Sequence, residues 1–169
     1  MDYTIRSLIT KDEPIVWKML QYATHESSLQ NVRKQPALAI YASKWGRFGD
    51  FGCIAERQTL PIGMAWLRLW PDEAKGYGYV SNEIPELAIA VLPDYRGQGI
   101  GTNLLTQVLA MGQRHYPGVS LSVRENNPVL RLYQRAGFIK VPGSETVNRA
   151  GEVSFNMVRK FESAYDTLA

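Results

Sequence analysis

The stretch formed by residues 86–101 constrains the fold of this chain more than any other, and it reads ELAIAVLPDYRGQGIG. Its apolar run, residues 87–92, is rich in Ile and Val and predicts a largely buried strand. Pro93 and Asp94 end that strand, because proline removes a ladder donor and favours a turn. From Ile100 onward, apolar residues recur at helical spacing. The stretch therefore predicts a strand, a glycine-rich loop and a helix in direct succession.

The glycine-rich loop has the chemistry of an anion site. Glycine lacks Cβ, so the backbone can approach a ligand closely, and the free N–H groups at a helix start favour a pyrophosphate. Arg96 would add a charge-assisted contact. The loop lacks the Gly-Lys-Ser/Thr of a P-loop, since Gly101 is followed by Thr102 and Asn103. It also lacks the final spacing of the dinucleotide-binding pattern G-x-G-x-x-G.

Two motifs carry a resemblance to a known family. The order Arg-x-x-Gly-x-Gly at residues 96–101, directly after a strand, resembles motif A of the GNAT family of N-acetyltransferases. Residues 126–138, NNPVLRLYQRAGF, resemble that family's other signature, N-x-x-[AV]-x-x-L-Y-x-[KR]-x-G-F. The two motifs occur in the family's order and at the expected distance. The likeness covers the C-terminal half well and the N-terminal half only in pattern.

The resemblance implies acetyl-CoA as the cofactor, used as the acetyl donor. No metal-ligand spacing appears in the sequence, so no metal is expected. Main-chain groups of the central strand would contact the pantetheine arm, Asn126 would touch the same arm, and the glycine loop would hold the pyrophosphate. The cofactor-binding residues implied in this way are Ile89, Ala90, Val91, Arg96, Gly97, Gln98, Gly99, Ile100, Gly101, Thr102, Asn126 and Tyr133.

The resemblance also implies two catalytic residues. Tyr133 would be the general acid that protonates the departing thiolate, although the same position also fits a core aromatic on the helix stripe. Glu86 would be the general base, directly or through water, since a partly buried carboxylate has a raised pKa. Glu83, Glu56 or a water chain are alternatives, and Glu86 also fits a plain surface residue. No Ser/His/Asp or Cys/His set stands out, so direct transfer in a ternary complex is favoured over an acyl-enzyme.

Four aromatic residues surround the end of the second hairpin strand and the loop after it. They either cover the sheet or line an acceptor pocket, where aromatic walls would suit a flat or cationic substrate. The candidate substrate-binding residues are Trp66, Trp70, Tyr77 and Tyr79.

The order of expected elements predicts an α/β (α+β) domain with a mixed, mostly antiparallel central sheet flanked by helices. The resemblance adds a splay between the strands near residues 89–91 and 121–123. Helices are expected from Thr10, in a capping box with Glu13, across residues 27–45 with a break near Pro36, and from Ile100 to about residue 115. A last helix is expected from Asn127, with Pro128 in its first turn and Gly137 directly after its C-cap. Strands are expected at residues 3–9, 51–57, 62–69, 86–92, 119–123, 138–141 and 153–161, with a polar loop at residues 142–151.

Composition sets the outer limits of these interpretations. At 169 residues the natural expectation is one domain, residues 1–169, and a net charge of +3 without a basic run gives no sign of nucleic-acid binding. The only cysteine, Cys53, excludes an internal disulfide and is expected to be a small apolar strand residue. Without a membrane-length apolar run or a visible signal peptide, the protein is expected to be cytoplasmic and not bound to a membrane.

Several functional alternatives stay open at this point. The main hypothesis is acetyl transfer to a primary amine, and the alternative is a non-catalytic acetyl-CoA-binding sensor or partner module. An acyltransferase that uses another acyl-CoA or a hydroxyl acceptor is also compatible with the motifs. The acceptor cannot be identified from these residues, because fold does not imply substrate. A homodimer is possible, since dimers are common among relatives.

Overall fold

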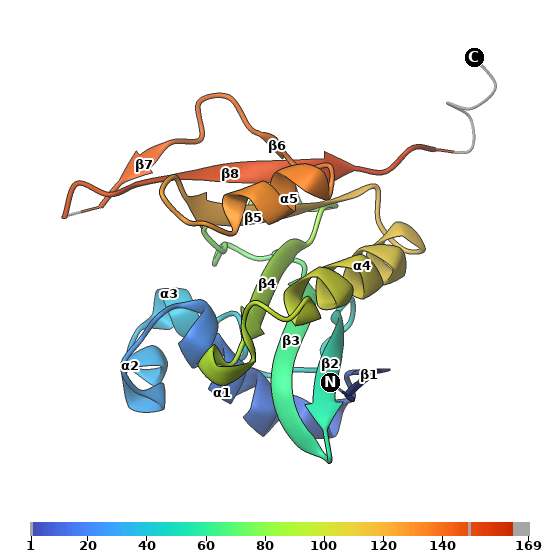
Figure 1. Ribbon diagram of the computed structural model, residues 1–169. Coiled ribbons are helices and arrows are strands. Elements are labelled where there is room, and N and C mark those ends of the chain that lie inside the picture. Colours follow the sequence, from blue (N-terminus) through green and yellow to red (C-terminus); the bar gives the residue numbers. More distant parts are fainter. Residues whose placement is uncertain (1, 149, 164–169) are drawn as a thin grey trace.

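The computed structural model describes residues 2–148 and 150–163, which build one eight-stranded sheet in the order β1-β2-β3-β4-β5-β8-β6, with β7 also paired to β8 (Figure 1). Every strand pair is antiparallel except β4 with β5. This confirms the mixed, mostly antiparallel sheet. The strands are β1 Thr4–Ser7, β2 Phe51–Arg57, β3 Leu60–Arg68, β4 Glu86–Val91, β5 Gly118–Arg124, β6 Ile139–Lys140, β7 Thr146–Val147 and β8 Val153–Lys160. The helices are η1 Thr10–Asp12, α1 Glu13–Ala23, α2 Leu29–Arg33, α3 Pro36–Ala39, η2 Pro93–Tyr95, α4 Ile100–Gln113 and α5 Leu130–Arg135.

The two halves of the sheet meet at β4 and β5 and then diverge. Among the described residues, the parallel pairing of these strands is limited to Glu86 opposite Ser120. Figure 1 shows β5 and β8 running across the top of the molecule, while β4 and β3 descend away from them. The splay therefore opens immediately beyond Glu86.

Helices cover the two faces of the sheet and create two cores. Alternation along β4 sends Leu87 into the cluster that contains α4, and Ala90 into the cluster that contains α1. The first cluster also takes in Tyr133 and Phe138 from the segment of α5. The second collects Trp66, Trp70 and Tyr41. Each face of β4 is thus packed against a different helical layer.

The start of α1 differs from the expectation. Thr10 is not its N-cap: residues Thr10–Asp12 form a 3-10 turn, and the carboxylate of Asp12 accepts the Ile9 N–H at 2.8 Å. Asp12 is available for this cap because Arg6 holds it in an ion pair at 2.8 Å. The α-helix then begins at Glu13, which the capping-box interpretation had placed in the third helical position.

The ends of α5 were predicted with mixed success. The helix begins at Leu130 rather than next to Asn127, whose side-chain oxygen accepts the Val129 N–H in the preceding turn. The predicted role of Gly137 is confirmed: it follows the C-cap with φ +90°, and the Phe138 N–H reaches back to the Tyr133 carbonyl at 3.0 Å.

Three other segments refine the sequence interpretation. The helical region across residues 27–45 is split by Pro36 into α2 and α3, and its last part forms turns. Strand β3 begins at Leu60, two residues earlier than expected, because Gln58 and Thr59 alone form the turn, both with positive φ. Strand β7 was missed inside a loop expected to be irregular. No helix within residues 2–148 and 150–163 has the length and apolar character needed to cross a membrane.

Candidate active site

The glycine-rich loop presents its backbone to open space. Gly97 and Gly99 have φ values of +72° and +81°, and apart from each glycine and its two chain neighbours no atom of the described residues lies within 4 Å of a Cβ placed at either position. Gly99 is the N-cap of α4, so the N–H groups of the first helical turn follow directly. Arg96 is exposed, and its Nε donates to the carbonyl of Val91 at 3.0 Å, which ties the loop to the end of β4. This geometry suits a phosphate group.

The edge of β4 that faces β5 offers main-chain groups for a ligand. The Leu92 N–H donates to the Ile62 carbonyl on β3, and the Ser120 N–H donates to the Pro85 carbonyl on the other side. Because successive residues of a strand alternate in direction, Ile89 and Val91 direct their N–H and C=O groups toward β5, and of these the Val91 carbonyl already accepts from Arg96 Nε. The two strands have separated at that point, so an extended ligand can pair with this edge as an added strand does.

Tyr133 lies on α5 with 8% of its surface exposed. Its ring packs edge-on against Phe138 at a centroid distance of 5.9 Å. Burial raises its pKa, so the phenol stays protonated at neutral pH. Among the described residues its hydroxyl has no hydrogen-bond partner. Asn126 is exposed in the turn between β5 and α5.

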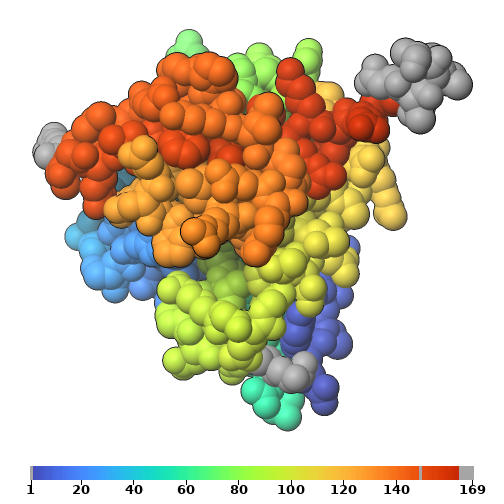
Figure 2. All heavy atoms as spheres, turned by 45° about the horizontal axis from the view of Figure 1, so that its top comes forward, coloured from blue at the N-terminus to red at the C-terminus, as the bar shows by residue number. Residues whose placement is uncertain are grey.

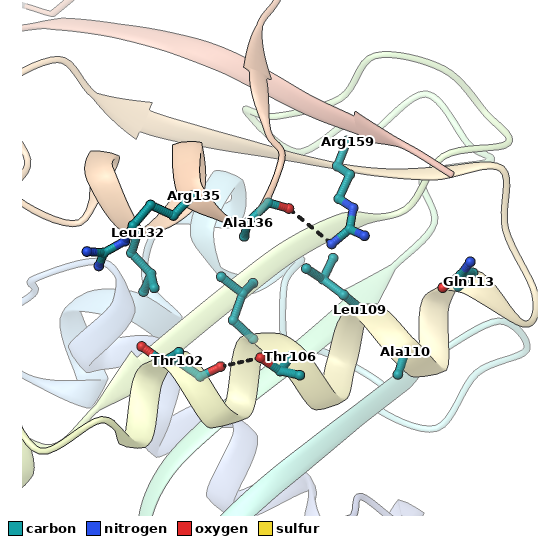
Figure 3. A pocket seen from close by; sticks show the side chains of 10 residues that line it. Thr102, Thr106, Leu109, Ala110, Gln113, Leu132, Arg135, Ala136 and Arg159 are labelled. Atoms are coloured by element: carbon teal, nitrogen blue, oxygen red, sulfur yellow. Dashed lines mark hydrogen bonds between the residues drawn. The ribbon is translucent and has the colours of Figure 1, made fainter. Parts of the chain in front are cut away.

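A cavity of about 370 Å³ lies between α4 and α5 and runs along α4 from Thr102 in its first turn to Gln113 at its end. Its floor is apolar and two guanidinium groups border it, as Figure 3 shows. The Arg159 guanidinium donates to the Ala136 carbonyl at 3.0 Å. In the space-filling view of Figure 2, the surface is hollowed where the orange atoms of α5 overhang the yellow-green segment that leads into α4. The lining includes Thr102, Leu109, Leu132, Arg135, Ala136 and Arg159.

Glu86 sits at the vertex of the splay and is enclosed, with 4% of its surface exposed. The Tyr41 hydroxyl donates to its Oε2 at 2.5 Å, and the Trp70 indole Nε1 donates to its Oε1 at 3.0 Å. Burial raises the pKa of Glu86 to about 7, although the hydrogen bonds from Tyr41, Trp70 and the Gly78 backbone favour the ionised form. The carboxyl group therefore titrates near neutral pH.

The segment of residues 76–79, here called the strap, covers this carboxylate. A Cβ on Gly76 would lie 2.2 Å from Oε1 of Glu86, and one on Gly78 would lie 2.7 Å from the carbonyl carbon of Leu121. The Ser120 hydroxyl donates to the Gly78 carbonyl at 2.7 Å. Only glycine fits at these two positions of the strap, which lies against both Glu86 and β5.

Tyr41 is the residue of this site that the sequence interpretation missed. It follows α3, and no motif or spacing connects it with a strand 45 residues later. The Trp66 indole donates to its carbonyl at 2.9 Å. The one available signal was the pair Gly76 and Gly78 in an aromatic stretch, which marks a close backbone approach.

The four aromatic candidates for acceptor binding separate into two groups. Trp66 and Trp70 are each 1% exposed and belong to the core, so they form no open wall. Tyr77 is 63% exposed on the strap. Tyr79 is partly buried and donates its hydroxyl to Asn82 at 2.6 Å. We therefore keep only Tyr77 and Tyr79 as candidates for acceptor contact.

The remaining candidate groups lie elsewhere. Glu56 pairs with Arg6 at 2.9 Å at the hairpin end of the sheet, opposite to the end that holds Glu86. Glu83 is exposed on the connection that leads to β4. Cys53 is buried, which raises the pKa of its thiol to about 12. The part of the chain that the structure describes contains no group of three or more His, Cys, Asp or Glu able to hold a metal ion.

Comparison with known proteins places these features in a family. The sequence model of the acetyltransferase (GNAT) family matches residues 5–138, most of the chain and both motifs. The chain belongs to the GNAT acetyltransferase family. It is 33% identical over 95 residues to the peptidyl-lysine N-acetyltransferase YjaB of Salmonella typhimurium, a match that spans 55% of this GNAT chain and 61% of that relative.

Solved structures share the GNAT fold over nearly the full length. The yncA protein of Salmonella typhimurium, solved with its cofactor acetyl-CoA, has a TM-score of 0.71 at 18% identity and covers 96% of both chains. The ribosomal-protein-S18-alanine N-acetyltransferase of Escherichia coli has a TM-score of 0.65 at 24% identity and also covers 96% of both chains. At these identities the likeness establishes the fold alone.

Proposed function

We propose that this GNAT protein is an acetyl-CoA-dependent N-acetyltransferase that moves an acetyl group directly to a primary amine in a ternary complex. The observation that carries the proposal is the β4 edge, which is unpaired beyond Glu86 and leads straight into the glycine loop at the start of α4. An extended thioester arm pairs with such an edge, and its pyrophosphate reaches the helix start.

The cofactor contacts in this proposal follow the order of the chain. Main-chain groups of Ile89 and Val91 bind the pantetheine amides, and the backbone of residues 96–102 binds the pyrophosphate. Beyond the loop, the cavity between α4 and α5 offers an apolar floor for the adenine ring, and Arg135 and Arg159 offer charge for the 3′-phosphate. Asn126 is proposed to contact the pantetheine arm from the opposite side of the splay.

The transfer itself needs one bond made and one broken. The neutral amine nitrogen attacks the thioester carbonyl carbon, the oxyanion is stabilised by a β4 backbone N–H near Val91, and the C–S bond then breaks. Tyr133, protonated and without a partner among the described residues, gives its proton to the departing thiolate. Glu86 receives the proton that the amine loses, directly or through water.

We propose a protein lysine side chain as the first acceptor to test. The support is the name of the relative that is 33% identical over 95 residues, a peptidyl-lysine N-acetyltransferase. The exposed aromatic ring of Tyr77 beside the site suits a cationic amine. The decisive experiment is a thiol-release assay with acetyl-CoA and a panel of lysine peptides, N-terminal peptides, polyamines and free amino acids. If no amine in the panel raises the release of CoA above the hydrolysis background, the proposal is wrong.

One observation favours a second candidate, a domain that binds acetyl-CoA without catalysis. Both oxygens of Glu86 already accept hydrogen bonds from protein donors, Tyr41 and Trp70, and the strap covers them, so this carboxylate is not openly presented to an amine. Calorimetric titration separates the two cases. Micromolar acetyl-CoA binding without turnover of any amine would favour the binding domain, whereas turnover that falls in Glu86→Gln supports the enzyme.

A further inference from the structure

The Tyr41 hydroxyl joins two parts of the site through one oxygen atom. It donates to Oε2 of Glu86 at 2.5 Å and accepts the Tyr77 N–H of the strap at 2.8 Å. The Tyr41 ring also packs edge-on against Trp70 at 5.1 Å, and Trp70 supplies the donor to the other carboxylate oxygen. Tyr41 thus contacts the Glu86 carboxylate, the second residue that donates to it, Trp70, and the strap that covers it.

A buried ion pair fixes the backbone on which Tyr41 stands. The Arg68 guanidinium donates to the carbonyls of Ile40 and Ser43 at 2.7 Å each and pairs with Asp50 at 2.9 Å. Arg68 and Asp50 side chains are 1% and 2% exposed. Burying two charges carries a desolvation cost of several kcal/mol, which is offset only by complete hydrogen bonding of this kind. The buried guanidinium therefore fixes the backbone on both sides of Tyr41, at Ile40 directly before it and at Ser43 two residues after it.

We propose that Tyr41 is a positioning residue for acetyl transfer, which holds the Glu86 carboxylate in its ionised orientation and fastens the strap across it. The proposal rests on the function proposed above. It gives a role in the reaction to the segment after α3, which lies outside both family motifs. Tyr41 acts through Glu86. Removal of the Tyr41 hydroxyl therefore changes the ionisation of Glu86 and leaves the binding of acetyl-CoA largely unaffected.

The charges around Glu86 make the direction of the effect clear. The groups that act on its carboxyl are neutral donors: the Tyr41 hydroxyl, the Trp70 indole and the Gly78 amide. Two cations, Lys75 and Arg47, contact Trp70 instead: the Lys75 Nζ donates to its carbonyl at 2.6 Å, and the Arg47 guanidinium lies 5.4 Å from its ring centroid. The Tyr41 pKa is raised well above its ordinary value by burial and by Glu86, so this phenol remains a donor throughout the working pH range. Loss of the Tyr41 hydroxyl therefore raises the pKa of Glu86.

The experiment compares the wild type with Tyr41→Phe and with the matched control Tyr116→Phe. The control removes a tyrosine hydroxyl that bonds to the Gly49 carbonyl and, among the described residues, makes no hydrogen bond to Glu86, Tyr41 or Tyr77. The pKa of Glu86 is measured by NMR of carboxyl-labelled protein, assigned with Glu86→Gln, and the pH profile of kcat/KM is recorded on the same samples. Hydrogen exchange of the Tyr77 amide reports the attachment of the strap.

We expect Tyr41→Phe to raise the NMR pKa of Glu86 by roughly one unit, or about tenfold in the ionisation constant. The acid limb of kcat/KM should move by the same amount, and the Tyr77 amide should exchange faster. Tyr116→Phe should leave all three readouts unchanged. Trp70→Phe is the second variant, because it removes a donor to Glu86 and keeps the Tyr41–Tyr77 bond: it should raise the pKa without speeding Tyr77 exchange.

Two results would overturn the proposal. One is an unchanged NMR pKa in folded Tyr41→Phe, and the other is an acid limb that stays in place while the NMR pKa moves. A wild type that turns over no amine in the panel would sink the proposed function instead. The NMR titration and the Tyr77 exchange rate would then still decide whether Tyr41 positions the carboxylate.

Discussion

The hydroxyl of Tyr41 lies 2.5 Å from Oε2 of Glu86, although 45 residues separate the two in the chain. The contact occurs where β4 and β5 begin to diverge, so it joins the layer of α1–α3 to the vertex of the splay. A carboxyl group in this position is both buried and fully hydrogen-bonded. The raised pKa of about 7 follows from the burial, and it sets the conditions under which the group can act as a base.

The first prediction concerns the pH dependence of activity. If Glu86 is the base, its ionised form is required. Because a lysine amine is mostly protonated below about pH 9, kcat/KM is calculated on the concentration of neutral amine, and it should then rise with pH through about 7 and level off. Glu86→Gln should lose this acid limb and about 10²- to 10⁴-fold in kcat. Steady-state kinetics from pH 5.5 to 9 checks this, and an acid limb that persists in the variant would contradict it.

The second prediction concerns stability. In the folded protein the pKa of Glu86, about 7, lies above its ordinary value of 4.5, so between these values the folded state holds a proton that the unfolded state has released. The contribution of Glu86 to stability is therefore present below pH 4.5 and is lost as pH rises toward 7, by at most about 1.4 kcal/mol per pH unit.

Urea denaturation of the wild type and of Glu86→Gln at pH 5 and pH 7.5 measures this contribution. The amide of the variant cannot titrate. The free energy of unfolding should therefore fall more between pH 5 and pH 7.5 in the wild type than in Glu86→Gln. Equal pH dependence in the two proteins would show that Glu86 is not protonated in the folded state at pH 5.

The third prediction uses two glycines with similar positive φ angles. Gly99 and Gly143 have φ values of +81° and +75°, and beyond its chain neighbours a Cβ at either one meets no atom of the described part of the chain within 4 Å. A tryptophan at either position should cost a similar strain of about 1–2 kcal/mol. Calorimetric titration should show at least a tenfold loss of acetyl-CoA affinity in Gly99→Trp and none in Gly143→Trp. Parallel losses in the two variants would mean that the loop does not bind the cofactor.

The fourth prediction concerns Tyr133. Because its hydroxyl has no hydrogen-bond partner among the described residues, Tyr133→Phe should leave the free energy of unfolding and the acetyl-CoA affinity nearly unchanged. As the proposed general acid its loss should lower kcat by about 10²-fold. Chemical denaturation and single-turnover kinetics test the two halves separately. An unchanged rate of the chemical step would leave Tyr133 as a core aromatic.

The sequence was sufficient for the parts of the fold that are encoded locally. The spacing of apolar residues and the positions of the glycines predicted β4, the glycine loop and α4 directly, because these elements follow one another in the chain. Gly137 was predicted for the same reason, since a helix C-terminus requires a positive φ that is local. The predicted start of α1 was wrong because Arg6, which lies outside the local pattern, holds Asp12 where it caps the turn in place of Thr10.

The cluster around Glu86 could not be predicted, because its members come from segments that are far apart in the chain. The raised pKa of a partly buried carboxylate was anticipated, but the donors that enclose it come from the segment after α3, from the end of β3 and from the strap. Their meeting depends on how the layers of the domain pack, which no spacing within one motif records. Trp70 illustrates this: its aromatic character predicted a role at the site, and packing turned it inward as a donor to Glu86.

The last prediction tests whether the buried ion pair supports this cluster. Asp50 accepts from Nε and Nη2 of Arg68 at 3.1 and 2.9 Å and from the Gly46 N–H at 3.0 Å. Asp50→Asn leaves the Arg68 guanidinium buried without a counter-charge, so the free energy of unfolding should fall by about 3–5 kcal/mol. The matched control is Glu152→Gln, which breaks an exposed pair with Arg124 at 3.4 Å and should cost no more than about 1 kcal/mol.

A second readout separates global stability from positioning. Arg68 holds the carbonyls on either side of Tyr41, so a displaced guanidinium should loosen the Tyr41 contact and raise the NMR pKa of Glu86 in Asp50→Asn under conditions where the variant is still folded. Glu152→Gln should leave that pKa in place. If Asp50→Asn is destabilised while the pKa of Glu86 stays at its wild-type value, the ion pair stabilises the domain without positioning Tyr41. The other contacts of Tyr41, the Trp66 indole bond to its carbonyl and the edge-on packing against Trp70, would then be sufficient to hold it in place.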